Sequence, residues 1–228
     1  MSTLLLTQSA DLQPGGQRAV RAAIVGVLSV WFVLILSLGA AGAFVGPPGT
    51  PPLPIAIAVS APLVLFFVLL RLSRNFREFV LTLDLRLIVG IQAWRWAGLG
   101  FLSLYAHKIL PAVFAFPAGL GDMAVGVTAP WMVLALIRQP GFAESGAFIR
   151  WNVMGILDLM VAVGIATASA FLATGTPGEI STAPMAMLPL VLIPGFFVPV
   201  FLMLHAAALM QSRRLMRNRA PYTTAPVR

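Results

Sequence analysis

Apolar residues form long runs along this chain, separated by short segments rich in proline, glycine and arginine. Each run holds about 20 residues, enough for a helix to cross a hydrocarbon layer of roughly 30 Å. The runs do not alternate apolar and polar residues, as the strands of a membrane barrel do. The pattern therefore predicts an all-α bundle of six transmembrane helices, over residues 22–44, 54–70, 87–106, 117–137, 150–172 and 185–211.

The segments between these runs also carry local signals. Residues 46–52 read GPPGTPP and cannot continue a helix, because proline lacks the amide donor. Apolar positions within 76–87 recur at helical spacing, which predicts an interfacial helix. Residues 109–116 are apolar but too few to span a membrane, so we expect an interfacial turn or a re-entrant half-helix there. Pro117 is then expected in the first turn of the fourth helix, a position that proline favours. Three prolines in the sixth run, Pro189, Pro194 and Pro199, predict a kinked helix.

Composition agrees with a membrane protein. Hydrophobic residues make up 59% of the 228 residues and charged residues only 10%, and the mean hydropathy is +0.94, far from the usual soluble mixture. The absence of cysteine excludes disulfides, thiolate catalysis and thiolate metal sites. We expect a flexible cytoplasmic tail at 1–17, one transmembrane domain at 18–211 and a basic cytoplasmic tail at 212–228.

The net charge of +8 indicates topology rather than nucleic-acid binding. Arginines cluster at the ends of apolar runs, where positive residues mark cytoplasmic loops. Only Lys108 is assigned to the outside, so both termini are predicted to be cytoplasmic. The arginines assigned to the inside ahead of the C-terminal tail are Arg18, Arg21, Arg71, Arg74, Arg77, Arg86, Arg138 and Arg150.

A few polar side chains lie within the apolar runs and form the candidate site. An arginine at the centre of a bilayer costs about 2.5 to 3.5 kcal/mol on insertion scales, so Arg95 needs a carboxylate, carbonyl groups, water or a bound anion. Arg95 and Asp158 lie about 9 and 8 residues into helices of the same direction, roughly 12 to 13 Å deep, which predicts an ion pair. The candidate site comprises Gln92, Arg95, Asp122, Asp158 and His205.

The other polar positions are assigned by their place along the helices. Asp122 lies near the outer end of the fourth predicted helix, where Lys108 or free backbone amides are the expected partners, and so at a different depth from Asp158. His205 is expected on the inner half, within reach of Asp158 or packed as a helix-end histidine. His107 and Lys108 form a possible outer-side site.

No motif fixes a reaction. The chain lacks a His-Glu-x-x-His pair and a glycine-rich phosphate loop, and its two histidines are predicted on opposite leaflets, so no cofactor or metal site is expected and an enzyme is disfavoured. Two hypotheses remain. The first is a small transporter or channel-like protein that moves a solute, ion or proton, and the second is a non-catalytic subunit or scaffold that binds partner helices or a second copy. A polar cavity inside the bundle would favour the first.

Four stretches of the chain resemble a known group of proteins. They read QAWRW, LPAVFAFPAGLGD, RWNVMGILDL and LPLVLIPGFFVP, the last ending ahead of His205. Over residues 76–211 the chain resembles small, uncharacterised, multi-pass proteins of the bacterial inner membrane. The resemblance implies a location in that membrane and a six-helix fold, and it implies no activity.

Overall fold

The computed structural model describes the backbone of residues 14–219 and the side chains of residues 22–218. Its secondary structure is helical, with no strand among the described residues. Six of its helical segments are long and apolar enough to cross a membrane. In chain order the elements are α1 (Pro14–Ala40), α2 (Leu53–Leu72), α3 (Arg74–Thr82), α4 (Leu85–Ile91), η1 (Gln92–Gly98), α5 (Leu99–Ala106), α6 (Ala112–Arg138), η2 (Phe142–Glu144), α7 (Gly146–Leu172), η3 (Ala183–Ala186), η4 (Ile193–Phe197) and α8 (Val198–Arg219).

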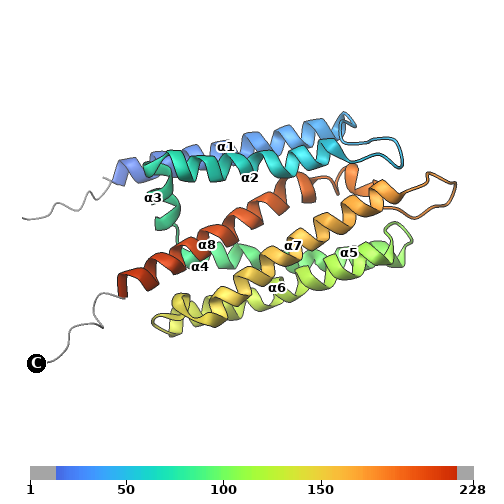
Figure 1. The fold of residues 1–228 in the computed structure, drawn as a ribbon. Helices are drawn as coiled ribbons and strands as arrows, with labels where there is room; N and C mark the ends of the chain where they lie inside the picture. The colour runs from blue at the N-terminus through green and yellow to red at the C-terminus, as the bar shows by residue number, and fades with distance from the viewer. Residues whose placement is uncertain (1–13, 220–228) are drawn as a thin grey trace, which may run out of the picture.

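The long helices lie lengthwise in one bundle (Figure 1). α8 runs through its middle and packs against α2, α3, α4 and α7, while α6 packs against α4, η1, α5 and α7. The first described residues of α1, the short helix α3 and the end of α8 lie at the same end of the bundle (Figure 1). We call this the α3 end, and the opposite end carries the turn between α5 and α6.

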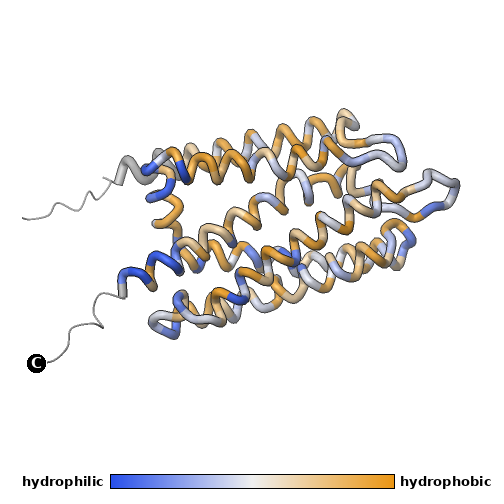
Figure 2. The backbone as a smooth tube through the Cα atoms, in the orientation of Figure 1, coloured by the Kyte–Doolittle hydropathy of each residue, from blue (hydrophilic) through white to orange (hydrophobic). Residues whose placement is uncertain are grey.

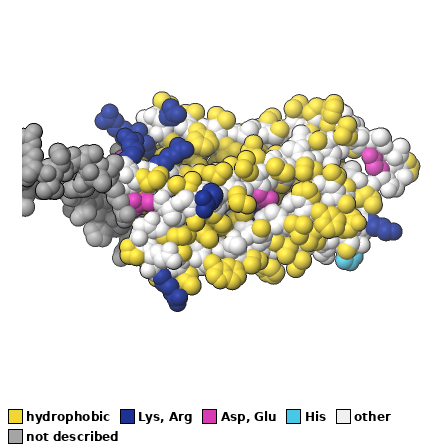
Figure 3. Space-filling view, turned by 60° about the horizontal axis from the view of Figure 1, so that its bottom comes forward, with side chains coloured by type: hydrophobic (Ala, Val, Ile, Leu, Met, Phe, Trp, Pro, Cys, Tyr) yellow, Lys and Arg dark blue, Asp and Glu magenta, His cyan; other side chains and the backbone are white. Residues whose placement is uncertain are grey.

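The outer surface of the bundle is largely apolar. Hydrophobic residues dominate the lengths of the helices, and hydrophilic residues gather near their ends (Figure 2). Most of the Lys and Arg side chains on the visible face lie toward the α3 end (Figure 3). Large apolar side chains such as Val30, Phe67 and Met154 are exposed. An apolar exterior with charged ends suggests a membrane protein.

α3 confirms the short helix that was expected between the second and third apolar runs. The side chain of Ser73 caps it by accepting a hydrogen bond from the amide of Phe76 at 3.2 Å. Gln211 on α8 then donates hydrogen bonds to the carbonyl groups of Val80 and Leu83, both at 3.0 Å. These contacts fasten the α3 to α4 connection to the core of the bundle.

α6 begins five residues earlier than expected, and no re-entrant segment precedes it. Residues 107–110 form a turn and a bend, Pro111 is the N-cap, and residues 112–116 begin the helix. Pro117 is therefore inside α6 rather than in its first turn. A proline inside a helix removes one hydrogen bond and bends the helix without having to end it. The prediction of a separate element at 109–116 was wrong for this reason.

The sixth predicted helix is interrupted rather than merely kinked. Residues 187–191 leave the helical conformation, and η4 is a π-helical stretch of five residues before α8 begins at Val198. Each of the three prolines removes an amide donor, so the segment cannot keep regular α-helical bonding. α8 also extends to Arg219, so the basic tail predicted from 212 begins as helix, and 220–228 lie outside the described residues. At the other terminus, the predicted tail at 1–17 lies outside the described residues up to residue 13, and 14–17 belong to α1.

The half of the bundle toward the α3 end is tightly packed. Its largest apolar cluster joins α2, α3, α4, α6, α7 and α8. Val89, Ala129, Phe148 and Ala208 in this cluster are completely buried. The candidate polar residues lie between this cluster and the opposite half of the bundle.

Candidate functional site

The 3-10 winding of η1 sets the direction of the candidate arginine. In a 3-10 helix, residues three apart eclipse one another. Gln92, Arg95 and Gly98 follow this spacing, and all three are buried on one side of η1. Trp94 and Trp96 are 71% and 57% exposed, so neither indole is buried with Arg95. The sequence Gln-Ala-Trp-Arg-Trp-Ala-Gly thus turns its polar residues inward and both indoles outward.

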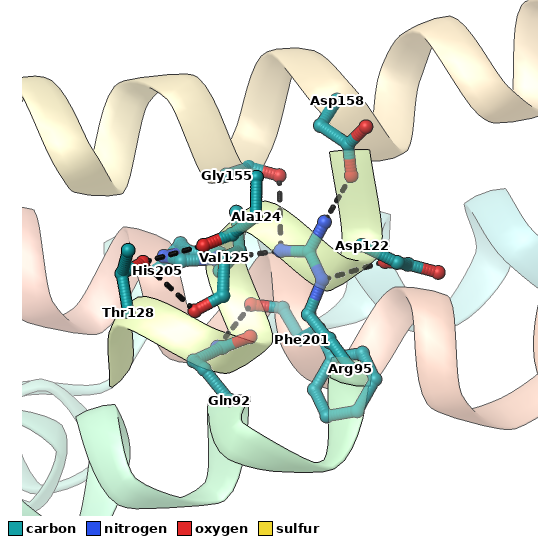
Figure 4. Close-up of polar contacts among 10 residues, drawn as sticks. All are labelled: Gln92, Arg95, Asp122, Ala124, Val125, Thr128, Gly155, Asp158, Phe201 and His205. Atoms are coloured by element: carbon teal, nitrogen blue, oxygen red, sulfur yellow. Dashed lines mark hydrogen bonds and ion pairs between the residues drawn. The ribbon is translucent and has the colours of Figure 1, made fainter. Parts of the chain in front are cut away.

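Arg95 lies at the centre of a polar cluster built from four elements (Figure 4). Its Nε donates to Oδ1 of Asp122 on α6 at 2.7 Å, and its Nη2 forms an ion pair with Oδ2 of Asp158 on α7. Its Nη1 donates to the carbonyl of Gly155 on α7 at 3.3 Å and contacts Nε2 of His205 on α8 at 3.1 Å. The side chain of Arg95 is completely enclosed by these partners.

His205 extends the cluster as a hydrogen-bonded chain. A guanidinium can only donate, so Nε2 of His205 accepts from Arg95 and Nδ1 carries the hydrogen. Nδ1 donates to Oδ1 of Asn152 at 2.9 Å, and Nδ2 of Asn152 donates to the carbonyl of Phe148 at 2.9 Å. The bond to Phe148 fixes the orientation of the Asn152 amide, and through it the tautomer of His205.

Glycines make room for the cluster. A side chain at Gly121 would occupy the position of the Asp158 carboxylate, and one at Gly155 would collide with the imidazole of His205. A Cβ at Gly98 would lie 2.6 Å from Cβ of Asp122 and 2.8 Å from the carbonyl of Gly119. At Gly126 it would collide with the backbone of η1. The absence of these side chains lets η1, α6, α7 and α8 approach closely enough to share one guanidinium.

The expected ion pair between Arg95 and Asp158 is present, and two other expectations were wrong. Asp122 does not contact Lys108, which lies exposed in the turn between α5 and α6 with φ of 57°. Asp122 and Asp158 do not lie at different depths, since both bind the same guanidinium. Because α6 starts at Ala112, Asp122 is about 15 Å along its axis rather than one turn from its end.

Of the two histidines, His205 belongs to the polar cluster and His107 does not. His205 is completely buried and does not reach Asp158 directly, because Arg95 contacts both side chains and lies between them. His107 is exposed, and its Nδ1 contacts the carbonyl of Ser103 at 2.8 Å within its own helix end. The possible outer-side site at His107 and Lys108 is therefore separate from the cluster.

Sequence reasoning missed Asn152 and the carbonyl of Gly155. Asn152 is completely buried, and its amide is a polar group in an apolar helix, which was a usable signal. It precedes Gly155 and Asp158 on the same face of α7. The carbonyl of Gly155 had no such signal, because its role depends on how closely α7 approaches η1. Gln92 donates from Nε2 to the carbonyl of Phe201 at 3.3 Å, and its Oε1 has no partner among the described residues.

The cluster holds one more acidic group than basic groups. Two carboxylates share one guanidinium, and His205 takes part as a neutral ring. With both carboxylates ionised, the cluster would carry one net negative charge in a low-dielectric interior. Such a charge requires a proton or a cation. The described residues contain no group of three His, Cys, Asp or Glu side chains suited to a metal ion.

Two clefts meet at Asp122. The larger, of about 230 Å³, lies between η1, α5, α6, η4 and α8. We call it the aromatic cleft, after its lining residues Trp94, Phe101, Phe197 and Phe201. The smaller, of about 60 Å³, extends along the small-residue face of α7 toward the start of α2. We call it the alanine cleft, after Ala162, Ala166 and Ala170. Both clefts are mainly apolar, and Asp122 is the carboxylate that lines them.

Comparison with known proteins assigns a family but no activity. Residues 52–213 match the family model of a domain of unknown function, DUF8737. No curated protein and no solved structure matches the chain. The matched region contains all residues of the polar cluster and both clefts, whereas α1 precedes it. The chain therefore belongs to the DUF8737 family of domains of unknown function.

Proposed function

We propose that this chain is an integral protein of a bacterial inner membrane with six spanning helices and a cytoplasmic α3 end. Six long apolar helical segments and an apolar exterior support insertion. Exposed arginines on α2, α3, α4 and α8 crowd the α3 end, as expected of a cytoplasmic side. Lys108 and Glu179 lie at the opposite end, in the turn after α5 and the loop after α7.

Labelling of single cysteines tests this topology, because the chain has no native cysteine. Cysteines at Thr50, Lys108 and Thr176 are expected to react from outside with a membrane-impermeant thiol reagent. Cysteines at Arg74 and Ser145 are expected to react only after the membrane is opened. In the loop after α7 we choose Thr176 for labelling and avoid the neighbouring Gly175, because the positive φ of 72° at Gly175 disfavours a side chain. Labelling of Arg74→Cys from outside would overturn the six-helix arrangement.

Within this topology we infer a small transporter in which Asp122 and Asp158 carry a proton. The observation that carries this inference is the pair of carboxylates on one guanidinium, which leaves one acidic group in excess inside the bundle. Ionisable groups buried at membrane depth are costly and typically mark proton or ion pathways. The clefts give Asp122 access from the half of the bundle away from the α3 end, and the packed apolar cluster closes the other half.

Proton flux into proteoliposomes tests the transporter. A potassium diffusion potential, negative inside, should drive protons inward, and a trapped pH-sensitive dye should record the acidification. Asp122→Asn is expected to reduce the flux to that of protein-free liposomes. Glu78→Gln is the matched control, because Glu78 is an exposed carboxylate that pairs with Arg214 at the α3 end. Wild-type flux no greater than that of empty liposomes would reject the transporter.

The second candidate is a non-catalytic subunit or scaffold in which the cluster only locks the bundle. The complete enclosure of Arg95 and the mainly apolar clefts favour this alternative. It predicts no proton flux together with a strong loss of stability when Arg95 is replaced. A transporter predicts that Asp122→Asn abolishes flux while the protein remains folded.

A further inference from the structure

The aromatic cleft combines aromatic rings with a carboxylate, whereas the transport of a proton would not require the aromatic rings. Phe101, Phe197 and Phe201 line the cleft, together with Trp94, whose side chain is largely exposed. The rings of Phe197 and Phe201 are stacked, with centroids 6.2 Å apart, and Phe201 lies under the Arg95 guanidinium, 6.0 Å from ring centroid to Cζ. Asp122 also lines the cleft. Aromatic faces beside a carboxylate are the chemistry that recognises ammonium groups.

Asp122 can accept a second partner. Its Oδ1 binds Arg95, and Figure 4 shows its other carboxylate oxygen turned away from the guanidinium. The Asp122 side chain remains 17% exposed, whereas that of Arg95 is completely enclosed. Arg95 also lines the cleft, but its side chain has no exposed surface, so the Asp122 carboxylate is the charged group that a ligand there can reach. Because the cluster has one acidic group in excess, the site favours a positive charge.

We propose that the aromatic cleft binds a small organic cation, with a protonated or quaternary ammonium group against Asp122 and an apolar group among the phenylalanine rings. This inference rests on the proposed transporter and names its substrate class. A cleft of about 230 Å³ suits a compact amine. An anion would face the carboxylate, and a bare metal ion would find one carboxylate among aromatic rings rather than the several oxygen ligands that it needs.

Binding of the cation should release a proton. In the empty site the excess negative charge is neutralised by a proton shared within the cluster, and a permanent cation replaces it, so one proton leaves for each cation bound. The charged and titratable groups facing Asp122 are Arg95 on η1, Asp158 on α7 and, through Arg95, His205 on α8. A quaternary ammonium does not titrate, so any pH dependence of its affinity arises from these groups.

Calorimetric titration with benzyltrimethylammonium tests the proposal on the full chain in lipid nanodiscs. We expect saturable binding whose affinity rises by about tenfold per pH unit while the cluster still holds the proton. Neopentylbenzene, the neutral analogue of the same shape, should bind far more weakly. Asp122→Asn should lower the affinity by more than about 30-fold, the effect of removing one partner of a close charge pair. Glu78→Gln, at an exposed carboxylate, should leave the affinity unchanged.

A second pair of variants keeps the test decisive if Asp122→Asn does not fold. Phe197→Leu removes one aromatic face and should weaken binding by about 3- to 30-fold. Phe196→Leu is its matched control, because Phe196 contacts the rings of Trp31 and Phe32 on α1 and that of Phe197, but does not itself line the cleft. Equal affinities for the two variants would overturn the proposal.

Two further binding results bear on the cation site. Neutral and charged analogues binding alike, or no saturable binding because a lipid acyl chain fills the cleft, would overturn the proposal. The binding assay does not depend on transport. Binding without proton flux would reject the transporter and keep the cation site, whereas flux without binding would do the reverse.

Discussion

α1 and α2 differ in both hydropathy and burial from the segments that carry Gln92, Arg95 and His205. The apolar spans 22–40 and 53–72 have mean hydropathies of 2.5 and 2.6, yet only 11% of each is buried. The span 85–106, which carries Gln92 and Arg95, has a hydropathy of 1.3 and is 33% buried. The span 193–218, which carries His205, has a hydropathy of 2.0 and is 44% buried. The two most apolar spans are thus among the least buried, and the two most buried spans carry Gln92, Arg95 and His205.

This difference in burial follows if the protein is surrounded by lipid, as we propose. Lipid tails are as apolar as leucine, so apolar side chains gain little by leaving lipid for another helix. Polar groups and glycines gain more, because they need hydrogen-bond partners and allow close backbone contact. Apolar runs thus specify which segments face lipid, and their interruptions specify which helices meet. The following variants test this contrast.

The largest effect is expected at Arg95. Arg95→Met leaves two carboxylates without their shared guanidinium, which should destabilise the protein by about 3 to 5 kcal/mol or prevent folding. Arg214→Met removes an arginine that also pairs with a carboxylate, but its partner Glu78 is exposed, so the loss should stay below about 1 kcal/mol. Denaturant unfolding in detergent measures both. Similar losses for the two variants would mean that the central cluster contributes no more than a surface ion pair.

The two carboxylates provide the second test. Asp158→Asn leaves Arg95 paired with Asp122, and Asp122→Asn leaves it paired with Asp158, so each single variant should lose only about 1 to 2 kcal/mol. The double variant leaves an unpaired buried charge and should lose about 3 to 5 kcal/mol, more than the sum of the two single losses. A double-mutant cycle measured by the same unfolding assay gives the coupling. Strictly additive losses would contradict a shared guanidinium.

Sequence reasoning found the apolar frame and most of the cluster, because both are local in the chain. Continuous apolar runs marked the six long segments, and ionisable residues inside them marked Arg95, Asp122, Asp158 and His205. Counting from arginines at the helix starts also placed Arg95 and Asp158 at one depth. The errors arose where a helix boundary depended on proline. Placing the start of α6 at Pro117 moved Asp122 away from the centre and concealed its contact with Arg95.

The details of the cluster are not local and could not be predicted. The 3-10 winding of η1 decides that Gln92, Arg95 and Gly98 share a face, and an α-helix would have placed Gly98 off that face. The π-helical turn of η4 depends on how several prolines are accommodated between neighbouring helices. The roles of Gly121 and Gly155 appear only when their neighbours are in place, because each glycine accommodates a side chain from another helix.

Glycine substitutions give the third test. At Gly126 an added Cβ would collide with backbone atoms of η1, which cannot rotate away, so Gly126→Ala should cost about 1 to 3 kcal/mol. At Gly26 on α1 no atom lies within 4 Å of the added Cβ. Gly26→Ala should therefore be neutral or stabilise by up to about 1 kcal/mol through helix propensity. Thermal unfolding measures the stability of both variants. Equal shifts in their unfolding temperatures would mean that η1 and α6 are not in close contact.

The smallest effect is expected where α1 attaches. Trp31 packs against Phe196 of η4, with ring centroids 4.8 Å apart. Trp31→Leu should cost only about 0.5 to 1.5 kcal/mol, the contribution of one aromatic pair. Trp131 on α6 is 60% exposed, so Trp131→Leu, the same substitution on an outward face, should change stability by less than about 0.5 kcal/mol. Neither variant should alter cation binding at Asp122. A loss for Trp31→Leu as large as that for Arg95→Met would show that α1 is integral to the core despite preceding the region matched by the family.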